Sequence, residues 1–245
     1  MTLTCLVLAG GLGTRMSTFT TTMPKILIPV NNRPFLHHQL DLLEDQGFTR
    51  IVLSLGYLGS MVLDELERIP HENLDIEFMF DGPEPLGTGG AVRQVCQHHI
   101  LDDYFFITYG DSYLEIDPRQ VISGFDDSNF DALMTLYSNE ERLEIANAKI
   151  SQNGSVHYKK NMPNPSALGF DMVDFGMSYV SRQSLLTNIL PEEPSDLAHY
   201  FEKISEEGRL QGFISAQRFY EIGSHAGRDA LELYLSERKN KHDTR

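Results

Sequence analysis

Residues 8–25 read L-A-G-G-L-G-T-R-M-S-T-F-T-T-T-M-P-K and continue an apolar run, so a strand leads into this stretch. Three glycines stand near its start: Gly10, Gly11 and Gly13. A glycine-rich turn after a strand lets backbone N–H groups come close to a phosphate. Arg15 and Lys25 add two cations, and arginine binds phosphate oxygens in pairs whereas lysine acts as a point charge. The stretch predicts a phosphate-binding loop; the alternative is a glycine-rich connection with unrelated cations downstream.

Other motifs of nucleotide and acyl chemistry are excluded. A dinucleotide fingerprint G-x-G-x-x-G that began at Gly11 would need a glycine where the chain has Met16. The P-loop string G-x-x-x-x-G-K-[ST] does not occur in the sequence. The string G-x-S-x-G is also absent, so acyl transfer has no support.

The charge of the chain limits its partners. Its 245 residues carry 20 basic and 35 acidic side chains, for a formal net charge of −15. Such a protein binds nucleic acid or an anionic membrane poorly, so neither is expected as a partner. An acidic protein that binds a polyphosphate has to place its cations deliberately, and a divalent ion such as Mg²⁺ would help it to hold the anion.

Cysteine usage and the N-terminus predict a cytoplasmic protein. Cys5 falls in a strand-like run and Cys96 in a helix-like one, and no C-x-x-C pair occurs. This pattern favours buried reduced thiols over a disulfide or a structural zinc site. The first residues lack the basic region of a signal peptide, and no apolar run reaches the ~18 residues of a membrane span.

The first half of the chain alternates strands and helices. The apolar patterns predict strands at 3–9, 51–55, 76–80 and 104–109, and helices at 34–46, 61–69 and 88–99. Ser60 is the expected N-cap of the second helix. Alternation at this spacing is typical of βαβ units with a largely parallel sheet, whose ligand loops lie at the carboxyl ends of the strands.

The second half predicts a different arrangement. Strands are expected at 132–137, 146–151, 156–158, 177–180 and 210–215, and helices at 184–190, 195–207 and 227–237. We interpret the strands between 132 and 180 as antiparallel additions that flank the parallel part. No linker separates the halves, so residues 1–237 are predicted to form one domain with two lobes, of about 1–130 and about 131–237. Residues 238–245 are predicted to be a flexible tail.

A second glycine-rich segment, E-P-L-G-T-G-G-A at 84–91, forms a tight turn at the start of a helix. Its backbone N–H groups are expected to point outward, and its glycines would let a flat ring lie against the backbone. The alternative is a helix start that is merely rich in small residues.

Two carboxylates are candidate metal ligands. Asp111 follows Gly110 directly after the strand 104–109, and Mg²⁺ binds one or two carboxylates together with substrate phosphates. The alternative for Asp111 is an Asx turn. Glu221 ends another short strand before a glycine, and it is either a second ligand or a surface side chain.

Lys159 and Lys160 end the strand 156–158. Either lysine is a candidate to hold the phosphate of a second substrate. The alternative is that both belong to a solvated face of the protein.

Together these segments resemble the sugar-phosphate nucleotidyltransferase family over nearly the whole chain. The signature G-G-x-G-T-R followed by P-K is matched at 10–15 and 24–25, and Gly110-Asp111 resembles the G-D metal motif of the family. The segments P-F-L and P-L-G-T-G-G-A are most similar to members that use GTP with heptose or mannose 1-phosphate. The resemblance implies an α/β, three-layer Rossmann-like fold with a mixed, mostly parallel sheet flanked by helices and a small antiparallel lobe on the sugar side. It also implies that residues of about 1–130 form a nucleotide-binding lobe and those of about 131–237 a sugar-phosphate lobe.

The resemblance also implies the roles of individual residues. Arg15 and Lys25 would be catalytic, and Asp111 and Glu221 would hold Mg²⁺. The nucleotide would contact Leu8, Ala9, Gly10, Gly11, Gly13, Thr14, Glu84, Leu86, Gly87, Thr88 and Gly89. The sugar phosphate would contact Gly110, Lys160, Asp174 and Gly176.

The implied reaction joins a nucleoside triphosphate to a sugar 1-phosphate and releases pyrophosphate. The attacking phosphate has a second pKa near ~6 and is already ionised at neutral pH, so the reaction needs positioning and charge neutralisation rather than a general base.

Departures from the family pattern keep alternatives open. Glu221 stands where the family has aspartate, and Lys159 stands where it has the sugar-contacting glutamate. Transfer of a cytidylyl or uridylyl group, a non-sugar phosphate or phosphonate as acceptor, and a non-catalytic nucleotide-sugar-binding regulatory subunit all remain alternatives. A homodimer also stays open.

Overall fold

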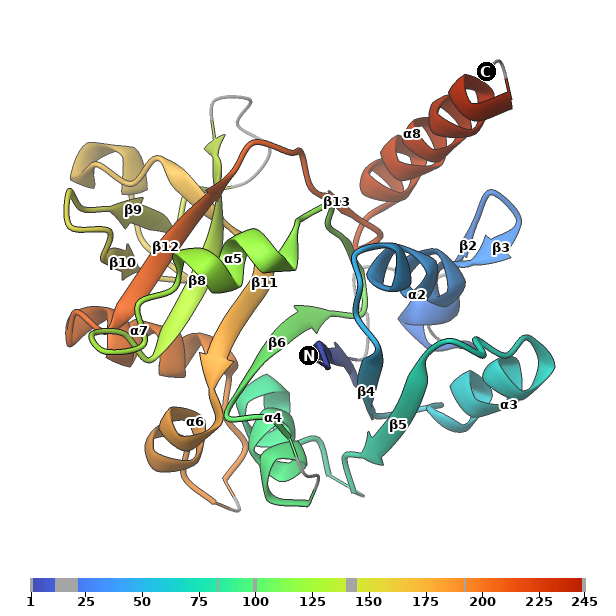
Figure 1. The fold of residues 1–245 in the computed structure, drawn as a ribbon, viewed down its shortest axis with the longest axis horizontal. Helices are drawn as coiled ribbons and strands as arrows, with labels where there is room; N and C mark the ends of the chain where they lie inside the picture. The colour runs from blue at the N-terminus through green and yellow to red at the C-terminus, as the bar shows by residue number, and fades with distance from the viewer. Residues whose placement is uncertain are drawn as a thin grey trace.

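A nine-stranded sheet runs through the protein (Figure 1). The structure is a computed structural model and describes residues 2–11, 22–82, 84–98, 101–139, 145–191 and 193–243. Its central strands lie in the order β6 (Tyr104–Tyr109), β1 (Thr4–Ala9), β4 (Arg50–Leu55) and β5 (Asp75–Phe80), and each pairs with its neighbour in parallel. The predicted parallel sheet is therefore confirmed, and the carboxyl ends of these strands meet at one edge.

The remaining strands extend the same sheet beyond β6. They are β11 (Met172–Ser181), β8 (Ala132–Ser138), β9 (Ala148–Ile150), β10 (Val156–Tyr158) and β12 (Leu210–Ser215). β11 runs antiparallel to β6, β8 and β9, as predicted, whereas β12 is parallel to β8. β11 is longer than the predicted strand at 177–180, because its pairing with β8 continues on both sides of an irregularity between Asp174 and Ser178.

Helices and short elements complete the chain. The helices are α2 (Phe35–Asp45), α3 (Ser60–Arg68), α4 (Gly87–His98), α5 (Pro118–Gly124), α6 (Arg182–Asn188), α7 (Leu197–Glu206) and α8 (His225–Asp243), with 3-10 turns η2 (Lys25–Leu27) and η4 (Pro165–Leu168). Two small antiparallel pairs join β2 (Pro29–Val30) to β3 (Arg33–Pro34), and β7 (Ser112–Tyr113) to β13 (Tyr220–Glu221). Among the described helices, none has the length and apolar character that a membrane crossing requires.

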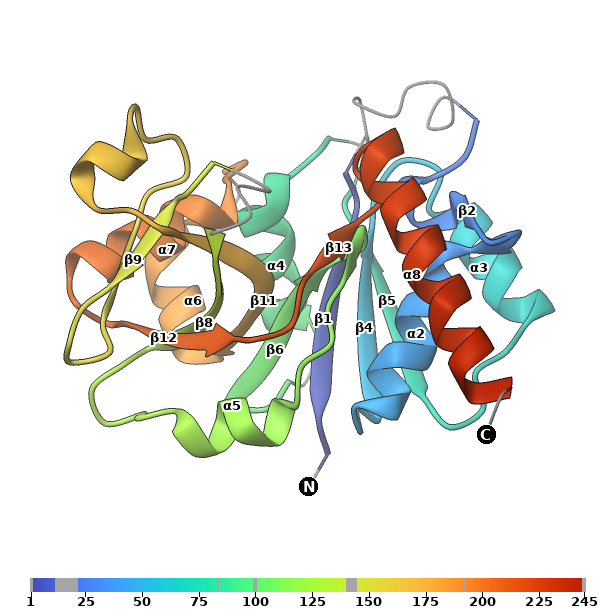
Figure 2. The ribbon, with the colours of Figure 1, turned by 90° about the horizontal axis from the view of Figure 1, so that it is seen from above.

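Two hydrophobic cores cover the two faces of the sheet, as the alternation of side chains along each strand requires. On β1, Cys5 and Val7 pack on one face, and Leu6 and Leu8 pack on the other. The first core takes in apolar side chains of α2, α3, α5 and α8, and the second takes in those of α4, α6 and α7. Figure 2 shows α2, α3 and α8 gathered on one side of the parallel strands and α4 on the other. The predicted three-layer fold is thereby confirmed.

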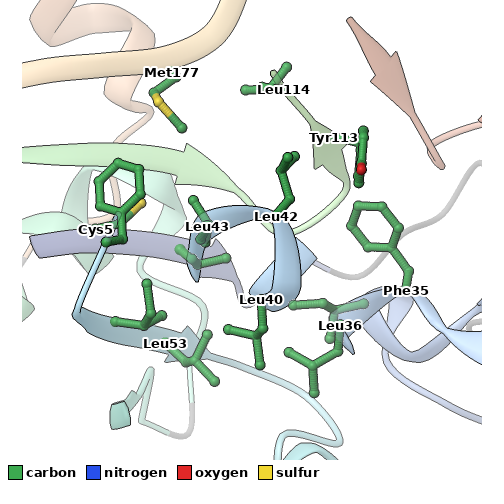
Figure 3. Packing of buried hydrophobic residues seen from close by; sticks show 14 of the residues in the cluster. Cys5, Phe35, Leu36, Leu40, Leu42, Leu43, Leu53, Tyr113, Leu114 and Met177 are labelled. Carbon is green, nitrogen blue, oxygen red and sulfur yellow. The ribbon is translucent and has the colours of Figure 1, made fainter. Parts of the chain in front are cut away.

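Helix α2 illustrates how sequence spacing produces this packing. Leu36, Leu40 and Leu43 recur at helical spacing and are almost fully buried. They gather with Cys5 of β1 and Leu53 of β4 (Figure 3). The helix ends before Gly47, whose φ of +91° is a left-handed conformation that glycine adopts without steric cost.

Three local predictions were wrong or incomplete. Helix α3 begins at Ser60, so Gly59 rather than Ser60 occupies the N-cap position. The sequence analysis did not predict α5, a helix of seven residues that Asp117 caps by accepting a hydrogen bond from the Arg119 N–H at 3.0 Å. Such a short helix depends on its cap rather than on a periodic apolar face.

The predicted tail at 238–245 is also corrected. α8 does not end at residue 237 but continues to Asp243. Arg238 forms an ion pair with Glu115 and donates a hydrogen bond to the Tyr113 hydroxyl at 3.3 Å. These contacts with the body of the protein extend the helix into a segment whose composition alone predicts fraying.

Candidate functional site

A cavity of about 350 Å³ opens at the carboxyl ends of β1 and β6. Residues predicted for the site line much of it: Leu8, Ala9, Gly10, Gly11, Lys25, Gly87, Thr88, Gly110 and Asp111. The rest of its lining consists of Ile26, Ser54, Asp81, Pro85, Ala91 and Tyr109. The fold thus brings together the glycine-rich end of β1, the start of α4 and the tip of β6, as the topology of a parallel sheet requires.

Lys25 and Asp111 meet at the rim of this cavity. Lys25 Nζ pairs with Asp111 Oδ2, and the two side chains are only 15% and 24% exposed. Lys25 is the first residue of η2. A partly buried lysine that pairs with a carboxylate can exchange that carboxylate for a phosphate oxygen.

Glu221 lies in the same cluster. β13 pairs Glu221 with Ser112, and the Ile222 N–H donates a hydrogen bond to the Asp111 carbonyl at 2.9 Å. Glu221 Oε2 and Lys25 Nζ lie 2.9 and 3.0 Å from the point where a Cβ on Gly223 would stand. The Lys25 ammonium therefore lies beside both carboxylates that the sequence predicts as metal ligands.

The donor set of this cluster fits Mg²⁺. No group of three or more metal-binding side chains occurs among the described residues, but Mg²⁺ takes one or two carboxylates and completes its shell with phosphates and water. Asp111 and Glu221 supply two such carboxylates, and the cation that lies beside them here is the Lys25 ammonium.

Gln39 holds the turn that carries Asp111. Its side chain is 3% exposed, and its Nε2 donates to the carbonyls of Tyr109 and Ser112 at 2.8 and 2.9 Å. These carbonyls flank Gly110 and Asp111, so α2 fixes the turn from behind. Gln39 was not among the residues predicted for the site, although a glutamine three positions after Leu36 on the inward face of a helix is an informative signal.

Asp81 and Ser54 were also missed. Asp81 directly follows β5, as Gly110 follows β6, and it is 8% exposed. The Ser54 hydroxyl donates to Asp81 Oδ1 at 3.4 Å. Burial raises the pKa of the Asp81 carboxyl, and the Ser54 hydrogen bond opposes this in part. An aspartate placed immediately after a predicted strand was the available signal.

Gly10 is required by close packing at the end of β1. A Cβ on Gly10 would stand 2.6 Å from Asp81 Oδ2 and 3.3 Å from the backbone nitrogen of Gly56. A Cβ on Gly56 would in turn stand 2.5 Å from the Gly10 carbonyl oxygen. At Gly11, no heavy atom of the described residues lies within 4 Å of such a position.

This difference predicts a matched pair of stability effects. Gly10→Ala should lower the free energy of unfolding by about 1–3 kcal/mol, because the methyl group displaces the Asp81 carboxylate. Gly11→Ala should change it by less than about 0.5 kcal/mol, since no described atom stands within 4 Å of the added methyl group. Urea denaturation of both variants measures this difference. Equal losses would show that the packing at Gly10 is not tight.

The second glycine-rich segment packs against the chain itself. The Gly89 N–H donates to the Ser195 carbonyl at 2.8 Å, so the expectation that it points outward was wrong. A Cβ on Gly87 would stand 2.4 Å from the same carbonyl oxygen. The lack of a side chain at these glycines therefore leaves room for the segment before α7. Of the residues predicted in this loop, only Gly87 and Thr88 line the cavity. Glu84 is exposed and Leu86 binds Ser195 through its carbonyl, so both lie outside the lining.

Thr88 links this loop to the predicted sugar-phosphate side. Its hydroxyl donates to Asp196 Oδ1 at 3.2 Å and accepts from the Leu197 N–H at 2.9 Å. Asp196 caps α7 and also pairs with Lys160. Lys159 instead pairs with Glu202 at 2.7 Å, so the two adjacent lysines have different partners.

Asp174 and Gly176 lie at the irregular point of β11. Gly176 has a φ of +93°, and its N–H donates to Asp174 Oδ1 at 2.9 Å. Burial raises the pKa of the Asp174 carboxyl to about 6, and the Gly176 N–H and the charge of Lys160 oppose this. Asp174 is thus a desolvated hydrogen-bond acceptor whose pKa the charge of Lys160 lowers in part.

The raised pKa of Asp174 predicts a pH-dependent stability difference. Because the folded state holds this proton up to about pH 6, ionisation of Asp174 costs stability as the pH rises through that value. Asp174→Asn removes the cost while it keeps an oxygen for the Gly176 N–H. The melting temperature of the variant should exceed that of the native protein at pH 7.5, and the excess should shrink between about pH 6 and pH 4. An excess that does not vary with pH would contradict this account.

Three predicted residues, Gly13, Thr14 and the catalytic candidate Arg15, lie outside the described residues. Their placement remains the prediction made from the sequence.

Comparison with known proteins identifies the family. The family model of the MobA-like NTP transferase domain matches residues 5–172. The chain belongs to this family. The predicted nucleotidyltransferase is thereby confirmed as the class of enzyme.

Individual relatives agree with this assignment. This NTP transferase is 27% identical to D-glycero-alpha-D-manno-heptose 1-phosphate guanylyltransferase of Aneurinibacillus thermoaerophilus, over 89% of its own length and 92% of the relative. It is 28% identical to the mannose-1-phosphate guanyltransferase of Emericella nidulans over 89% of its length, and it spans only 60% of that larger protein. The crystal structure of HddC from Yersinia pseudotuberculosis superposes with a TM-score of 0.79 and 25% identity, covering 95% of this chain and 99% of HddC.

Proposed function

We propose that this transferase joins the guanylyl group of GTP to a heptose or mannose 1-phosphate and releases pyrophosphate. The observation that carries the proposal is the cluster of Lys25, Asp111 and Glu221 at the rim of a cavity lined by the glycine-rich end of β1. Relatives named as guanylyltransferases of heptose and mannose 1-phosphate support the choice of substrates.

In this reaction an oxygen of the sugar phosphate attacks the α-phosphorus of GTP, and the bond to the β-phosphate breaks. Lys25 would leave Asp111 to bind the α-phosphate, and Lys160 would leave Asp196 to bind the sugar phosphate. Asp111 and Glu221 would hold a divalent ion, which supplies neutralising charge to the phosphates. Asp174 would accept hydrogen bonds from sugar hydroxyls and thereby orient the acceptor.

The ion pairs observed here fit such an exchange of partners. Each candidate phosphate-binding lysine pairs with a carboxylate, which compensates for the partial burial of its charge. The chain has a net charge of −15, which repels an anionic substrate. Cations that already lie at the site oppose this repulsion and favour the approach of the substrate.

The experiment that tests the proposal is pyrophosphate release with Mg²⁺ and each of GTP, ATP, CTP and UTP. Mannose 1-phosphate and D-glycero-α-D-manno-heptose 1-phosphate serve as acceptors, and glucose 1-phosphate is the control. Turnover that requires GTP and one of the first two acceptors would support the proposal. Preference for CTP or UTP, or for glucose 1-phosphate, would contradict it.

A non-catalytic nucleotide-sugar-binding subunit is the second candidate. The observations that favour it are Lys159 and Glu221, which replace a glutamate and an aspartate of the family pattern. It predicts that the protein melts at a higher temperature with GDP-mannose but releases no pyrophosphate with any of the four nucleotides.

We also propose a cytoplasmic location and one functional domain over residues 1–237. Cys5 and Cys96 are both buried and unpaired thiols, which suits a reducing compartment. A single sheet to which strands from both halves contribute supports one domain with two lobes.

A further inference from the structure

Asp111 and Glu221 lie on a small sheet of two short strands. β7 begins directly after Asp111, and β13 ends with Glu221. The two strands pair antiparallel, and Tyr113 lies opposite Tyr220. Strands of two residues do not keep such pairing in water, and this pair joins segments far apart in the sequence, so its closure also costs conformational entropy. Other parts of the protein must therefore hold the two carboxylates together.

Tyr234 of α8 packs across both strands. Its ring stacks on the Tyr220 ring of β13, with ring centres 4.6 Å apart and an interplanar angle of 23°. It also meets the Tyr113 ring of β7 edge-on, with ring centres 6.4 Å apart. One side chain thus contacts the residue before Glu221 on one strand and the strand that follows Asp111 on the other.

A hydrogen bond fixes the position of the Tyr234 ring. The Tyr234 hydroxyl donates to Glu115 Oε2 at 2.7 Å, and Glu115 lies just beyond the end of β7. Arg238, about one turn further along α8, forms an ion pair with the same carboxylate. Burial and the hydrogen bond to Glu115 raise the pKa of Tyr234, so its hydroxyl remains a donor at neutral pH. α8 is thereby attached to β7 as well as to β13.

The start of α8 packs against the backbone of Glu221. Residues 222–224 join β13 to α8, and the two elements lie side by side (Figure 2). A Cβ on Gly227 would stand 2.4 Å from the Glu221 carbonyl oxygen, so the first turn of the helix lies close to that residue. Ile222 and Leu231 are fully buried in the same core. The backbone of Glu221 therefore has little freedom once α8 is in place.

We propose that Tyr234 is a positioning residue, which holds Glu221 near Asp111 so that both carboxylates can bind one divalent ion. This role rests on the proposed function, because it concerns the metal ligands of that reaction. Tyr234 does not belong to the cavity lining, so it acts through the β7–β13 pair. Loss of a group that orients metal ligands from behind commonly weakens metal binding by about 10–100-fold.

The charges of the site explain why such packing is needed. The Lys25 ammonium pairs with Asp111 and lies near Glu221, and it compensates for the repulsion between the two carboxylates. When Lys25 binds a phosphate instead, this compensation is lost until the ion binds. Packing by Tyr234 would keep Glu221 in place during this exchange. The affinity for the ion would therefore depend on aromatic contacts outside the cavity.

The test is binding of Mn²⁺, which replaces Mg²⁺ because the free ion gives an electron paramagnetic resonance signal. Titration of the nucleotide-free protein measures the dissociation constant without turnover. Tyr234→Ala removes the ring and should raise this constant by about 10-fold or more. Tyr234→Phe keeps both ring contacts and loses the hydrogen bond to Glu115, so its constant should stay within about 3-fold of the native value. The Mg²⁺ concentration for half-maximal pyrophosphate release should shift in parallel, with little change of kcat at saturating Mg²⁺.

Tyr104→Ala is the matched control. Tyr104 begins β6, at the opposite end of that strand from Asp111, and its ring stacks on Tyr179 with ring centres 5.6 Å apart. Its loss should lower the melting temperature but leave the Mn²⁺ constant unchanged. No change in Tyr234→Ala, or an equal change in both variants, would overturn the positioning role. If Tyr234→Ala does not fold, Tyr234→Leu, which keeps apolar packing without a ring, should show the same rise.

Mn²⁺ binding also separates this role from the proposed function. If the native protein releases no pyrophosphate with any of the four nucleotides, the function is wrong, and the titration still decides the role of Tyr234. If the native protein uses GTP but Tyr234→Ala binds Mn²⁺ as tightly as the native protein does, the positioning role is wrong and the function stands. A native protein that binds no Mn²⁺ would also refute the positioning role.

Discussion

Asp111→Asn should lower kcat for pyrophosphate release from GTP by about 10²–10³-fold under saturating Mg²⁺. The substitution keeps the size of the side chain but removes a charge that the Lys25 ammonium and a divalent ion both require. Gln39 holds the turn through backbone carbonyls, so the loop should keep its shape in the variant. Rates at several Mg²⁺ concentrations, together with the melting temperature, measure the effect.

A matched control is available on α3. Asp64 is exposed on that helix, and Asp64→Asn removes the same charge away from the cavity lining. It should leave both turnover and its Mg²⁺ dependence unchanged. Full activity of Asp111→Asn would show that Asp111 is not a metal ligand.

Lys25→Met should produce the second large effect, with kcat lower by about 10²-fold. The ammonium pairs with Asp111 and lies near Glu221, so its removal takes a positive charge away from the neighbourhood of two carboxylates. Without Mg²⁺ the free energy of unfolding should fall by about 1–3 kcal/mol, because the partly buried Asp111 loses its ion pair with Lys25. Added Mg²⁺ should then raise the melting temperature of the variant by more than that of the native protein, since lysine no longer competes for the carboxylates.

Thermal melts with and without Mg²⁺ measure this shift in melting temperature independently of activity. Lys203→Met is the control, because Lys203 is an exposed lysine on α7. It should show the same response to Mg²⁺ as the native protein. A response of Lys25→Met that is no larger than this control would mean that lysine and metal do not share the two carboxylates.

The part of the cavity lining at the ends of β1 and β6 was predictable because its signals are local. Gly10 and Gly11 follow a strand directly, and Gly110-Asp111 follows another, so each motif carries its own structural context. Parallel pairing then places all strand ends at one edge, whatever the details of packing. The glycines after Leu86 were harder to interpret, because the group that they admit is Ser195, from a distant segment.

Asp81 and Gln39 show what the sequence reading overlooked. Each is a polar side chain at a position that the surrounding pattern makes inward or strand-terminal, and each is less than 10% exposed. Neither residue belongs to a motif, so its function depends on the groups that its side chain contacts in the folded protein. For Gln39 these are two carbonyls of the β6–β7 turn, and for Asp81 they are Ser54 and Gly10.

The sequence by itself determined the parallel strands, the faces that they bury and the position of the first glycine-rich segment at the end of β1. These features follow from the periodicity of apolar residues and from conformations that glycine allows, and both act over a few residues. Only the tertiary structure decided that Glu221 joins Asp111, that Lys25 lies beside both, and that Asp81 faces the cavity. Such contacts depend on how strands that are far apart in the sequence pair and pack. No local pattern of residues specifies that arrangement.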